Sequence, residues 1–433
     1  MADSWVALLM KTGPDKEKEN ILWNIAGSFC YAFASMVLSF LVMAVVGEEE
    51  GGIFAFGYST FGQQMFILAY FGIRPFQITD GGQEYRFGDY LHHRYRTCIL
   101  AAGAGILYLL LSGYKAEKAA VILLLVCYKT LDGFADVYES EFQRSGNLHL
   151  TGKSNTFRTL LSVGIFLGVL TWKKHLLLAC GAAVGAQILG VILFDEAVIK
   201  RLPGVDFSWE KGRLRPLTRE TVLLFVSVFL DFYIFSAAKY AIDANLDDAA
   251  SGYFNIIFMP TSVINLAAGF VIRPVLTGLT ETWKEERTGE FVRKLAGIIK
   301  IIGALSILAV VLAAGLGRPV LWIMERILGG AYEGRLICYH VPFILIVLGG
   351  ACYALLNLHY YALVIMRKQK VIFGIYGALT FIAAVTAPVL VRKAGIVGAA
   401  WAYLILMAVM AAAFEAWTWA EIGRKIRQAG GRP

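Results

Sequence analysis

Long apolar stretches separated by short polar segments run through almost the whole chain. A helix needs about 20 mainly apolar residues to cross a bilayer core roughly 30 Å thick, so each stretch of about this length is predicted to be one membrane-spanning helix. The pattern therefore predicts an all-α polytopic membrane protein with about twelve transmembrane helices. These lie at about residues 21–46, 53–73, 97–113, 119–138, 157–172, 176–198, 220–242, 253–277, 297–315, 337–365, 371–391 and 395–419.

A polar, basic segment at residues 199–219, rich in Pro and Gly, divides these spans into six and six. Because each half has an even number of spans, both halves have the same orientation, and any symmetry between them is a pseudo-two-fold along the membrane normal. We expect the two six-helix halves to enclose a central cavity. The expected regions are an N-terminal segment (1–20), an N-terminal lobe (21–198), the linker (199–219), a C-terminal lobe (220–420) and a tail (421–433).

An internal repeat supports two related halves. The segments 52–75 and 252–274 each begin with Gly-x-Phe and end on Ile-Arg-Pro, at Arg74 and Arg273 respectively. Both segments cover the second span of their half. We therefore expect Arg74 and Arg273 to lie at corresponding positions.

Composition agrees with a membrane protein. Of the 433 residues, 58% are hydrophobic and 17% are charged, against about 25% charged in a typical soluble domain. If the N-terminus is cytoplasmic, the inside segments carry about three times as many Lys and Arg residues as the outside segments, as the positive-inside rule requires. We therefore expect a multi-pass protein of the cell (cytoplasmic) membrane with both termini in the cytoplasm. The net charge of +8 is spread over short loops, which does not favour nucleic acid as a partner.

Charged residues inside the predicted spans are the candidate functional residues, because each costs about 2.5 kcal/mol or more at a helix centre unless it is paired or hydrated. The fourth span carries Lys129, Asp132 and Asp136, whose spacing of three and four places them on one helix face. They form either a local neutralising pair or a site for an ion or a phosphate.

The seventh span carries Asp231 and Lys239, which point to roughly the same side of their helix. Arg74 and Arg273 either anchor their helices to lipid headgroups or bind phosphate oxygens in a bidentate manner. The phosphate candidates are thus Arg74, Arg273, Lys129 and Lys239. Asp231, Asp132 and Asp136 are the candidates for a coupling proton or sodium ion, and Asp231 is either that site or a packing residue held by Lys239 or a neighbouring helix.

Motifs of catalysis are absent from the sequence. It contains no G-x-S-x-G, P-loop or HExxH pattern, its six cysteines form no CxxC pair, and His92-His93 has no acidic frame at metal-ligand spacing. We therefore expect neither an enzyme nor a cofactor or metal site. Only one outside segment, residues 315–336, is long.

Three further motifs join this pattern: Phe270-Val271-Ile272-Arg273-Pro274, Leu328-Gly329-Gly330-Ala331-Tyr332 and Gly395-Ile396-Val397-Gly398-Ala399-Ala400. With its twelve spans and two halves, the chain resembles the polysaccharide transporter family (Wzx-type O-antigen flippases) of the multidrug/oligosaccharidyl-lipid/polysaccharide exporter superfamily. The resemblance covers nearly the whole chain. The chain differs from the lipid II flippases in that their two additional C-terminal spans have no counterpart among its twelve predicted spans.

The resemblance implies a flippase for polyprenyl-diphosphate-linked oligosaccharides, which works by alternating access through a cationic cavity during surface polysaccharide assembly. The implied partners are the lipid-linked oligosaccharide, membrane lipids, and the polysaccharide polymerase and glycosyltransferases of the same pathway. One alternative is a multidrug or cation antiporter of the same superfamily, although Lys129, Lys239 and Arg273 favour an anionic ligand. A membrane-embedded glycosyltransferase or polymerase is a third possibility, and a scaffold without transport is a fourth.

Overall fold

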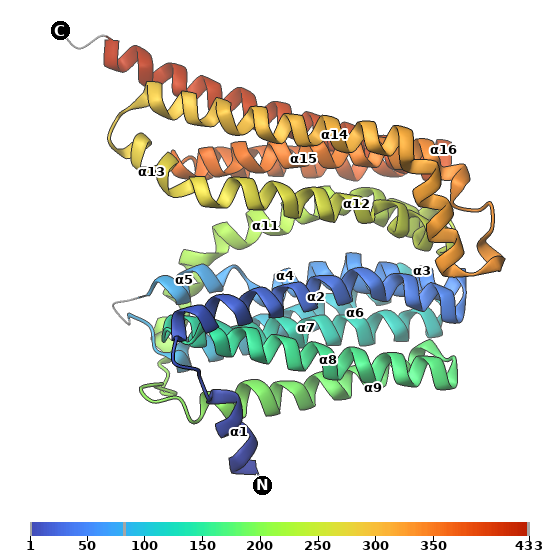
Figure 1. Ribbon diagram of the computed structural model, residues 1–433, viewed down its shortest axis with the longest axis horizontal. Coiled ribbons are helices and arrows are strands. Elements are labelled where there is room, and N and C mark those ends of the chain that lie inside the picture. Colours follow the sequence, from blue (N-terminus) through green and yellow to red (C-terminus); the bar gives the residue numbers. More distant parts are fainter. Residues whose placement is uncertain (1, 81–83, 431–433) are drawn as a thin grey trace. The chain divides into compact units, whose positions relative to one another are not determined.

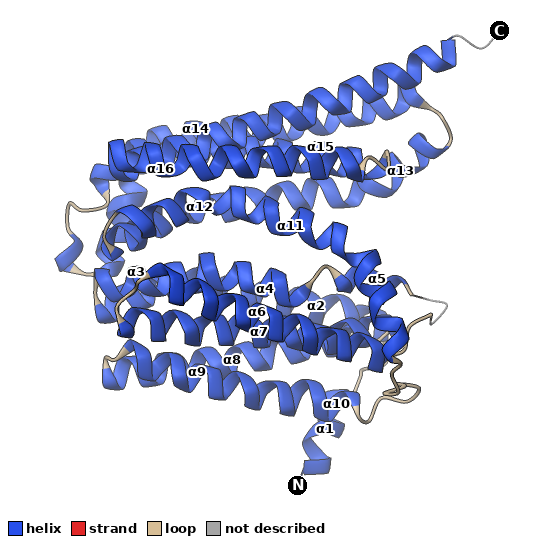
Figure 2. Ribbon diagram, turned by 180° about the vertical axis from the view of Figure 1, so that it is seen from behind, coloured by secondary structure: helices blue, strands red, loops and turns tan. Residues whose placement is uncertain are grey.

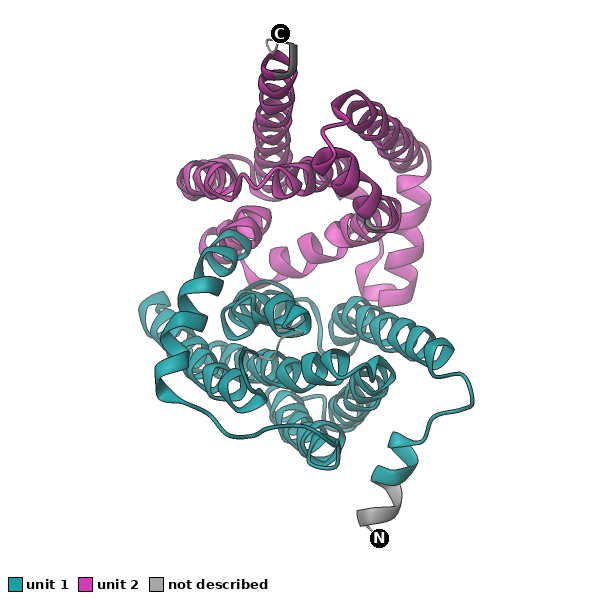
Figure 3. Cartoon of the chain, turned by 90° about the vertical axis from the view of Figure 1, so that its left-hand side faces the viewer, with its two compact units in different colours: residues 1–229 teal, residues 230–433 magenta. Residues whose placement is uncertain are grey.

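The structure is a computed structural model that describes residues 2–80 and 84–430. All regular elements among these residues are helices (Figure 2). The chain divides into two compact units, an N-terminal unit of residues 1–229 and a C-terminal unit of residues 230–433 (Figure 3). Helix α11 (Lys211–Asn245) begins inside the segment expected as a linker and continues across the boundary between the units.

The N-terminal unit contains ten helices, two π-helical segments and the first part of α11. They are α1 (Ala2–Met10), α2 (Lys16–Val46), α3 (Glu48–Phe56), the π-helix η1 (Gly57–Phe61), α4 (Gly62–Tyr70), α5 (Ile73–Thr79), α6 (Phe87–Ser112), α7 (Ala116–Arg144), α8 (Leu148–Lys173), α9 (Leu176–Gly190), the π-helix η2 (Val191–Glu196) and α10 (Ala197–Ile199).

Helix α7 is the centre of this unit and packs against α4, α6, α8 and α9 (Figure 1). Helix α8, which contacts α7, also packs against α2, and the backbones of α2 and α8 approach each other closely. A Cβ atom at Gly152 would lie 2.0 Å from the carbonyl oxygen of Trp23, so only glycine fits at this crossing. Small residues serve this purpose in membrane helix packing.

The C-terminal unit contains the rest of α11 and the elements that follow it. They are α12 (Asp248–Ile272), the 3-10 helix η3 (Arg273–Val275), α13 (Leu276–Lys284), α14 (Thr288–Leu328), the 3-10 helices η4 (Gly330–Tyr332) and η5 (Ile337–Tyr339), α15 (His340–Ile365) and α16 (Gln369–Gly430). Helix α15 is the centre of the unit and packs against α12, α14 and α16.

Eight helical stretches among the described residues are long and apolar enough to cross a membrane. The other expected spans are also helical, but each is too short, too polar or not separate enough to be counted as a distinct apolar helix of membrane-spanning length. Charge interrupts α7, the first turns of α8 are polar, and η1 breaks the second span into α3 and α4. The last two spans form one continuous element, α16, which breaks at Ala394 and Gly395, where the glycine has φ of 55°.

Lipid is the solvent that the outer faces require. Large apolar side chains such as Leu111, Ile99 and Phe381 are more than two-thirds exposed in the structure. A multi-pass membrane protein accounts for this exposure, since the hydrocarbon core accepts such side chains.

One expectation about a loop is wrong. Residues 315–328 were expected to lie in the long outside segment, but α14 continues as a helix to Leu328. Apolar residues recur at helical spacing through this stretch, including the buried Gly317, Leu321 and Leu328, and they extend the packed face of α14.

Candidate functional site

A stripe of polar side chains runs along one face of α7. Lys129, Asp132, Asp136, Glu139 and Gln143 follow one another at intervals of three and four residues, so they lie above one another on the helix. The first four are buried. The sequence predicted the first three members of this stripe, and the structure extends it by another two turns.

Arg158 of α8 binds the middle of the stripe. Its guanidinium lies 2.6 Å from Oε1 of Glu139 and 2.7 Å from Oδ2 of Asp195, and its Nε lies 4.0 Å from Asp132. Ser154 donates a further hydrogen bond to Asp195. Arg158 therefore neutralises carboxylates from two different helical elements, α7 and η2.

Arg74 and Arg94 bind the next part of the stripe. Nη1 of Arg74 lies 2.6 Å from Oδ1 of Asp136 and 3.3 Å from Glu139, while Nη2 of Arg94 lies 2.9 Å from Oδ2 of Asp136. Nη2 of Arg74 also donates to Oε1 of Gln143 at 3.2 Å. Arg74, a phosphate candidate, is therefore engaged by carboxylates in this structure.

These side chains form one buried charge network, which we define by its eight ionisable members. It balances four cations against four carboxylates: Arg74, Arg94, Arg158 and Lys129, and Asp132, Asp136, Glu139 and Asp195. A buried charged group is stable only when it is paired with a group of opposite charge and is hydrogen-bonded. The network meets this condition for all its members except one.

Lys129 is the exception. Among the described residues, no carboxylate lies within ion-pair distance of its ammonium group, although the side chain is only 2% exposed. The ammonium instead donates to the hydroxyl of Tyr31 at 3.0 Å and lies 3.9 Å from the centre of the Tyr58 ring. The Tyr31 hydroxyl in turn donates to Oδ2 of Asp132 at 3.0 Å, so Tyr31 separates the lysine from the aspartate.

The other oxygen of Asp132 is held independently of Tyr31. Nε2 of Gln187, from α9, donates to Oδ1 of Asp132 at 2.6 Å. Asp132, a coupling-ion candidate, thus has neutral hydrogen-bond donors on both sides and a guanidinium at the edge of its reach.

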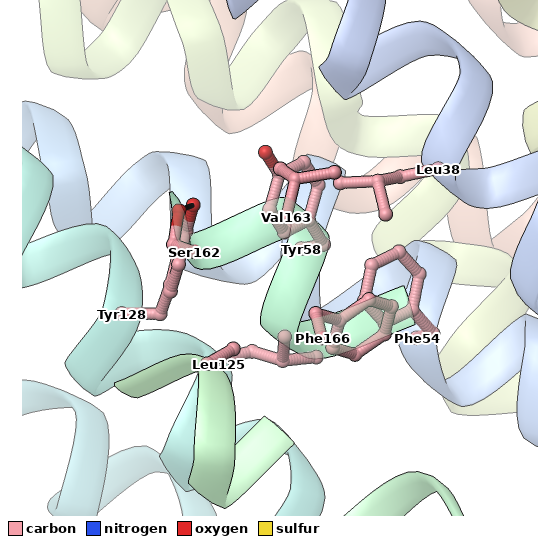
Figure 4. Close-up of a pocket in the computed structure, with 9 residues that line it drawn as sticks. Leu38, Phe54, Tyr58, Leu125, Tyr128, Ser162, Val163 and Phe166 are labelled. Carbon is pink, nitrogen blue, oxygen red and sulfur yellow. Dashed lines mark hydrogen bonds between the residues drawn. The ribbon is translucent and has the colours of Figure 1, made fainter. Parts of the chain in front are cut away.

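A small cavity lies one turn of α7 away from Lys129. Its walls are the apolar and aromatic side chains of Leu38, Phe54, Tyr58, Leu125, Tyr128, Ser162, Val163, Phe166 and Ala183 (Figure 4). The volume open to the centre of a water molecule is about 20 Å³, which is enough for one water by the criterion of about 10–15 Å³. The Tyr128 and Ser162 hydroxyls bond to each other at 2.9 Å, so the cavity offers few free polar groups.

Both π-helical segments of the N-terminal unit carry a side chain of this site. η1 carries Tyr58, which forms the floor below Lys129, and η2 carries Asp195, which binds Arg158. A π-helical turn adds one residue to the helical repeat and so rotates the following side chains, and such turns occur frequently at functional sites.

Beyond Gln143, the stripe ends in a second ionic group outside the predicted spans. Arg144 lies 2.8 Å from Glu141 and 3.5 Å from Asp80, and Asp80 also accepts a hydrogen bond from the Tyr90 hydroxyl. The nearby Tyr85 donates to Glu220 at 3.3 Å. Burial, followed by the negative charge of Glu220, raises the pKa of Tyr85 to about 12, so this hydroxyl stays protonated.

The C-terminal unit holds its two predicted charges differently. The Tyr353 hydroxyl of α15 donates to Oδ2 of Asp231 at 2.8 Å. Lys239 donates to Oδ1 of Asn255 at 3.1 Å and lies 4.3 Å from the centre of the Phe258 ring. Neither charged group forms an ion pair with the other in the described part of the chain, so each is held by neutral partners.

The side chain of Arg273 lies outside the described residues, and only its backbone, in η3, is placed. No group of three metal-ligating side chains is arranged around a common point among the residues that the structure describes.

Four members of the charge network were missed by the sequence analysis: Arg94, Arg158, Glu139 and Asp195. Arg94, Glu139 and Arg158 lie at or beyond the ends of the predicted spans, where charged residues are ordinarily hydrated, whereas Asp195 lies inside the predicted span 176–198, three residues from its end. For Glu139 a signal was present, because it continues the three-and-four spacing of α7. Pairing of Arg158 with Asp195 depends on tertiary contact between α8 and η2 and leaves no local pattern.

No protein-family model matches this sequence, and no curated protein matches it either. Solved structures do match the fold. The structure is similar to the inward-facing conformation of a multidrug resistance MATE family transporter of the MOP superfamily, with a TM-score of 0.69, 13% identity and coverage of 92% of this chain and 96% of that chain.

Two further solved structures extend this result. The lipid II flippase MurJ, in an inward closed conformation, has a TM-score of 0.67 at 12% identity, with coverage of 91% of this chain and 86% of that chain. A MOP superfamily transporter from Pyrococcus furiosus, described as having a binding pocket of reverse polarity, has a TM-score of 0.51 at 14% identity, with coverage of 97% and 98%. The fold is therefore that of MOP superfamily transporters, a helical polytopic membrane fold with two halves.

Proposed function

We propose that this protein is a flippase that moves a polyprenyl-diphosphate-linked oligosaccharide from the cytoplasmic to the outer face of the cell membrane by alternating access. The observation that carries this proposal is that two lysines have neutral partners instead of carboxylates. The buried Lys129 in one unit and the partly buried Lys239 in the other each have an ammonium group that contacts a neutral oxygen and an aromatic ring. An anionic headgroup would supply the opposite charge that both ammonium groups lack among the described residues.

Arginines support an anionic rather than a cationic substrate. In the N-terminal unit, Arg74, Arg94 and Arg158 occupy the carboxylates that an amphipathic cation would need. A diphosphate cannot cross hydrocarbon without a polar path, because a buried unpaired charge is prohibitively costly. The similarity of the fold to the lipid II flippase is consistent with a lipid-linked substrate.

The phosphate candidates have different expected roles in this proposal. Lys129 and Lys239 are the leading binding groups, whereas Arg74 would have to exchange Asp136 and Glu139 for phosphate. Arg273 remains a candidate from its sequence context alone. Asp231 is the leading candidate for a coupling ion, followed by Asp132 and then Asp136.

A multidrug or cation antiporter is the second candidate function. It is favoured by the similarity of the fold to a MATE family transporter and by Asp231, a carboxylate whose neighbour Tyr353 packs against Phe235 in a tilted arrangement, with ring centres 4.8 Å apart. Aromatic rings around a carboxylate suit an organic cation. A membrane-embedded glycosyltransferase or polymerase has no comparable support.

The test is accumulation of substrate in cells that lack this protein. We expect deletion cells to accumulate lipid-linked oligosaccharide on the cytoplasmic face, and this chain to restore its export together with the polymerase and glycosyltransferases of the pathway. Lys129→Met and Lys239→Met should fail to restore export, whereas Lys173→Met, at an exposed lysine whose ammonium lies over the Trp172 ring, should succeed. Deletion cells without accumulation, combined with sensitivity to cationic drugs, would favour the antiporter.

Orientation can be tested in the same cells. With both termini in the cytoplasm, a cysteine placed at Glu49 or Asp247 should react with an impermeant reagent added outside. A cysteine at Lys211 or Gln428 should not react, and the reverse pattern would overturn the proposed orientation.

A further inference from the structure

Tyr31 occupies an unusual position between two buried charges of opposite sign. Its hydroxyl accepts a hydrogen bond from the Lys129 ammonium and donates one to Asp132, both at 3.0 Å. A direct ion pair between Lys129 and Asp132, three residues apart on one helix, would need no intermediary. The tyrosine therefore takes a place on the lysine that a negatively charged oxygen would fill more strongly.

The ammonium of Lys129 has unused binding capacity. It has three N–H donors, and among the described residues its hydrogen-bond acceptor is the Tyr31 hydroxyl, with the Tyr58 ring face below it. The site thus contains a desolvated ammonium group that contacts one neutral oxygen, of Tyr31, and the face of one aromatic ring, of Tyr58. Such a site attracts an oxyanion, because charge-assisted hydrogen bonds are roughly twice as strong as neutral ones.

The three side chains of this site differ in exposure. Lys129 is 2% exposed and Tyr58 is 4% exposed, whereas Tyr31 is partly exposed. We infer that a ligand reaches the ammonium by displacing the Tyr31 side chain, which is the most exposed of the three. Tyr31 lies on α2, and its polar attachment to the rest of the unit consists of the bonds to Lys129 and Asp132.

Displacement of Tyr31 does not leave Asp132 without partners. Gln187 still donates to Oδ1 at 2.6 Å, and Nε of Arg158 lies 4.0 Å away. Opening therefore costs the two bonds of the Tyr31 hydroxyl and the contact of its ring with the ammonium, 5.2 Å from the ring centre, while a phosphate oxygen replaces the bond to Lys129 with a stronger one.

We propose that Lys129 is an oxyanion-binding site of the N-terminal unit that Tyr31 closes: its hydroxyl occupies the ligand position, Asp132 holds it there, and a phosphate oxygen of the substrate displaces it. This inference rests on the proposed function for the class of substrate and assigns its specificity to a single residue. Tyr31 acts as a gate that admits only ligands able to compete for the ammonium, which excludes neutral and cationic lipids.

The test is the binding of geranyl diphosphate to the purified full-length protein in detergent, with geraniol as the probe that lacks the charged group. We expect the wild type to bind the diphosphate and not geraniol, and Lys129→Met to bind it at least tenfold more weakly, roughly the value of one hydrogen bond to a charged group. Tyr31→Phe should bind about tenfold more tightly, because the ring stays while the closing hydroxyl is removed.

Two further variants keep the test decisive. Asp132→Asn weakens the hold on Tyr31 without changing the ring, so it should also bind more tightly, and it replaces Tyr31→Phe if that variant fails to fold. Tyr128→Phe removes a buried hydroxyl of α7 that bonds Ser162 of α8 rather than the ammonium of Lys129, and should bind like the wild type.

The outcomes separate this inference from the proposed function. Tighter binding by Tyr31→Phe, with normal binding by Tyr128→Phe, supports the gate. Wild-type or weaker binding by Tyr31→Phe overturns the gate while leaving a diphosphate flippase in place. Wild-type binding by Lys129→Met overturns the site itself, and absence of diphosphate binding by the wild type overturns both the site and the anionic substrate.

Discussion

The two units place very different helices at their centres. Helix α7 of the N-terminal unit carries Lys129, Asp132, Asp136 and Glu139 in its buried face. Helix α15 of the C-terminal unit contains no Asp, Glu, Lys or Arg in its whole length. One unit is thus assembled around ion pairs and the other around apolar contacts, although both are bundles of membrane-spanning helices.

This contrast separates charged side chains that form ion pairs within the protein from charged side chains that have neutral partners. Arginine can bind two carboxylates at once because its guanidinium is a planar fork, and Arg158 does so with Glu139 and Asp195. Lysine is a point charge with rotatable donors, and the buried Lys129 and the partly buried Lys239 each have a neutral hydrogen-bond partner. The arginines therefore hold the N-terminal unit together, while the lysines of both units are the groups that we propose bind the ligand.

The largest expected effect is in the N-terminal unit. Arg158→Met leaves Glu139, Asp195 and Asp132 without their shared cation, and loss of one partner from a buried ion pair costs about 3–5 kcal/mol. We expect a corresponding fall in the free energy of unfolding, measured by denaturant titration in detergent. Arg158→Met combined with Asp195→Asn should recover part of the loss, because one uncompensated carboxylate is removed.

The control for this variant is the exposed pair of Arg326 with Glu333, 3.7 Å apart, in the C-terminal unit. Surface pairs contribute little, so Arg326→Met should leave the free energy of unfolding close to that of the wild type. Equal effects of Arg158→Met and Arg326→Met would remove the distinction between the two units.

Sequence alone predicted much of the fold and a smaller part of the site. The spans and the three-residue stripe of α7 follow from local periodicity, and the break of α16 at Ala394 and Gly395 falls at the start of the last predicted span, 395–419. The partners of the stripe do not follow, because Arg94, Arg158 and Asp195 come from three other elements whose contacts with α7 are tertiary. Tyr31 was missed because a tyrosine in an apolar span is ordinarily a packing residue, and only its two hydrogen bonds distinguish it.

A smaller effect is expected where the C-terminal unit buries a carboxylate without a cation. Glu325 of α14 accepts hydrogen bonds from three backbone N–H groups of the following loop: Leu336 at 2.6 Å, Ile337 at 2.9 Å and Gly334 at 3.1 Å. Glu325→Gln removes the charge from these bonds, at a cost of about 1.5–3 kcal/mol. Hydrogen exchange of these three amides should accelerate accordingly, and unchanged exchange would show that the loop is held by other contacts.

Asp231→Asn should perturb stability less. The amide oxygen of asparagine can still accept the Tyr353 hydroxyl, so we expect a loss below about 1.5 kcal/mol, the range of one neutral hydrogen bond. The informative measurement is transport in proteoliposomes. If Asp231 binds the coupling ion, the folded variant should transport without dependence on an imposed proton or sodium gradient, whereas unchanged gradient-driven transport would eliminate Asp231 from this role.

Lys239→Met should have the smallest effect on stability and is the sharpest test of the contrast between lysines and arginines. The change removes a desolvated ammonium with no ion-pair partner among the described residues and leaves a flexible apolar side chain in the same space. The hydrogen bond to Asn255 and the cation–π contact with Phe258 are lost, each at a cost of roughly 1 kcal/mol, and relief of charge desolvation offsets this loss. We therefore expect an unfolding free energy near that of the wild type together with loss of transport. A fall as large as that of Arg158→Met would mean instead that Lys239 is a structural cation like the arginines, and the ligand-binding role of the unpaired lysines would have to be abandoned.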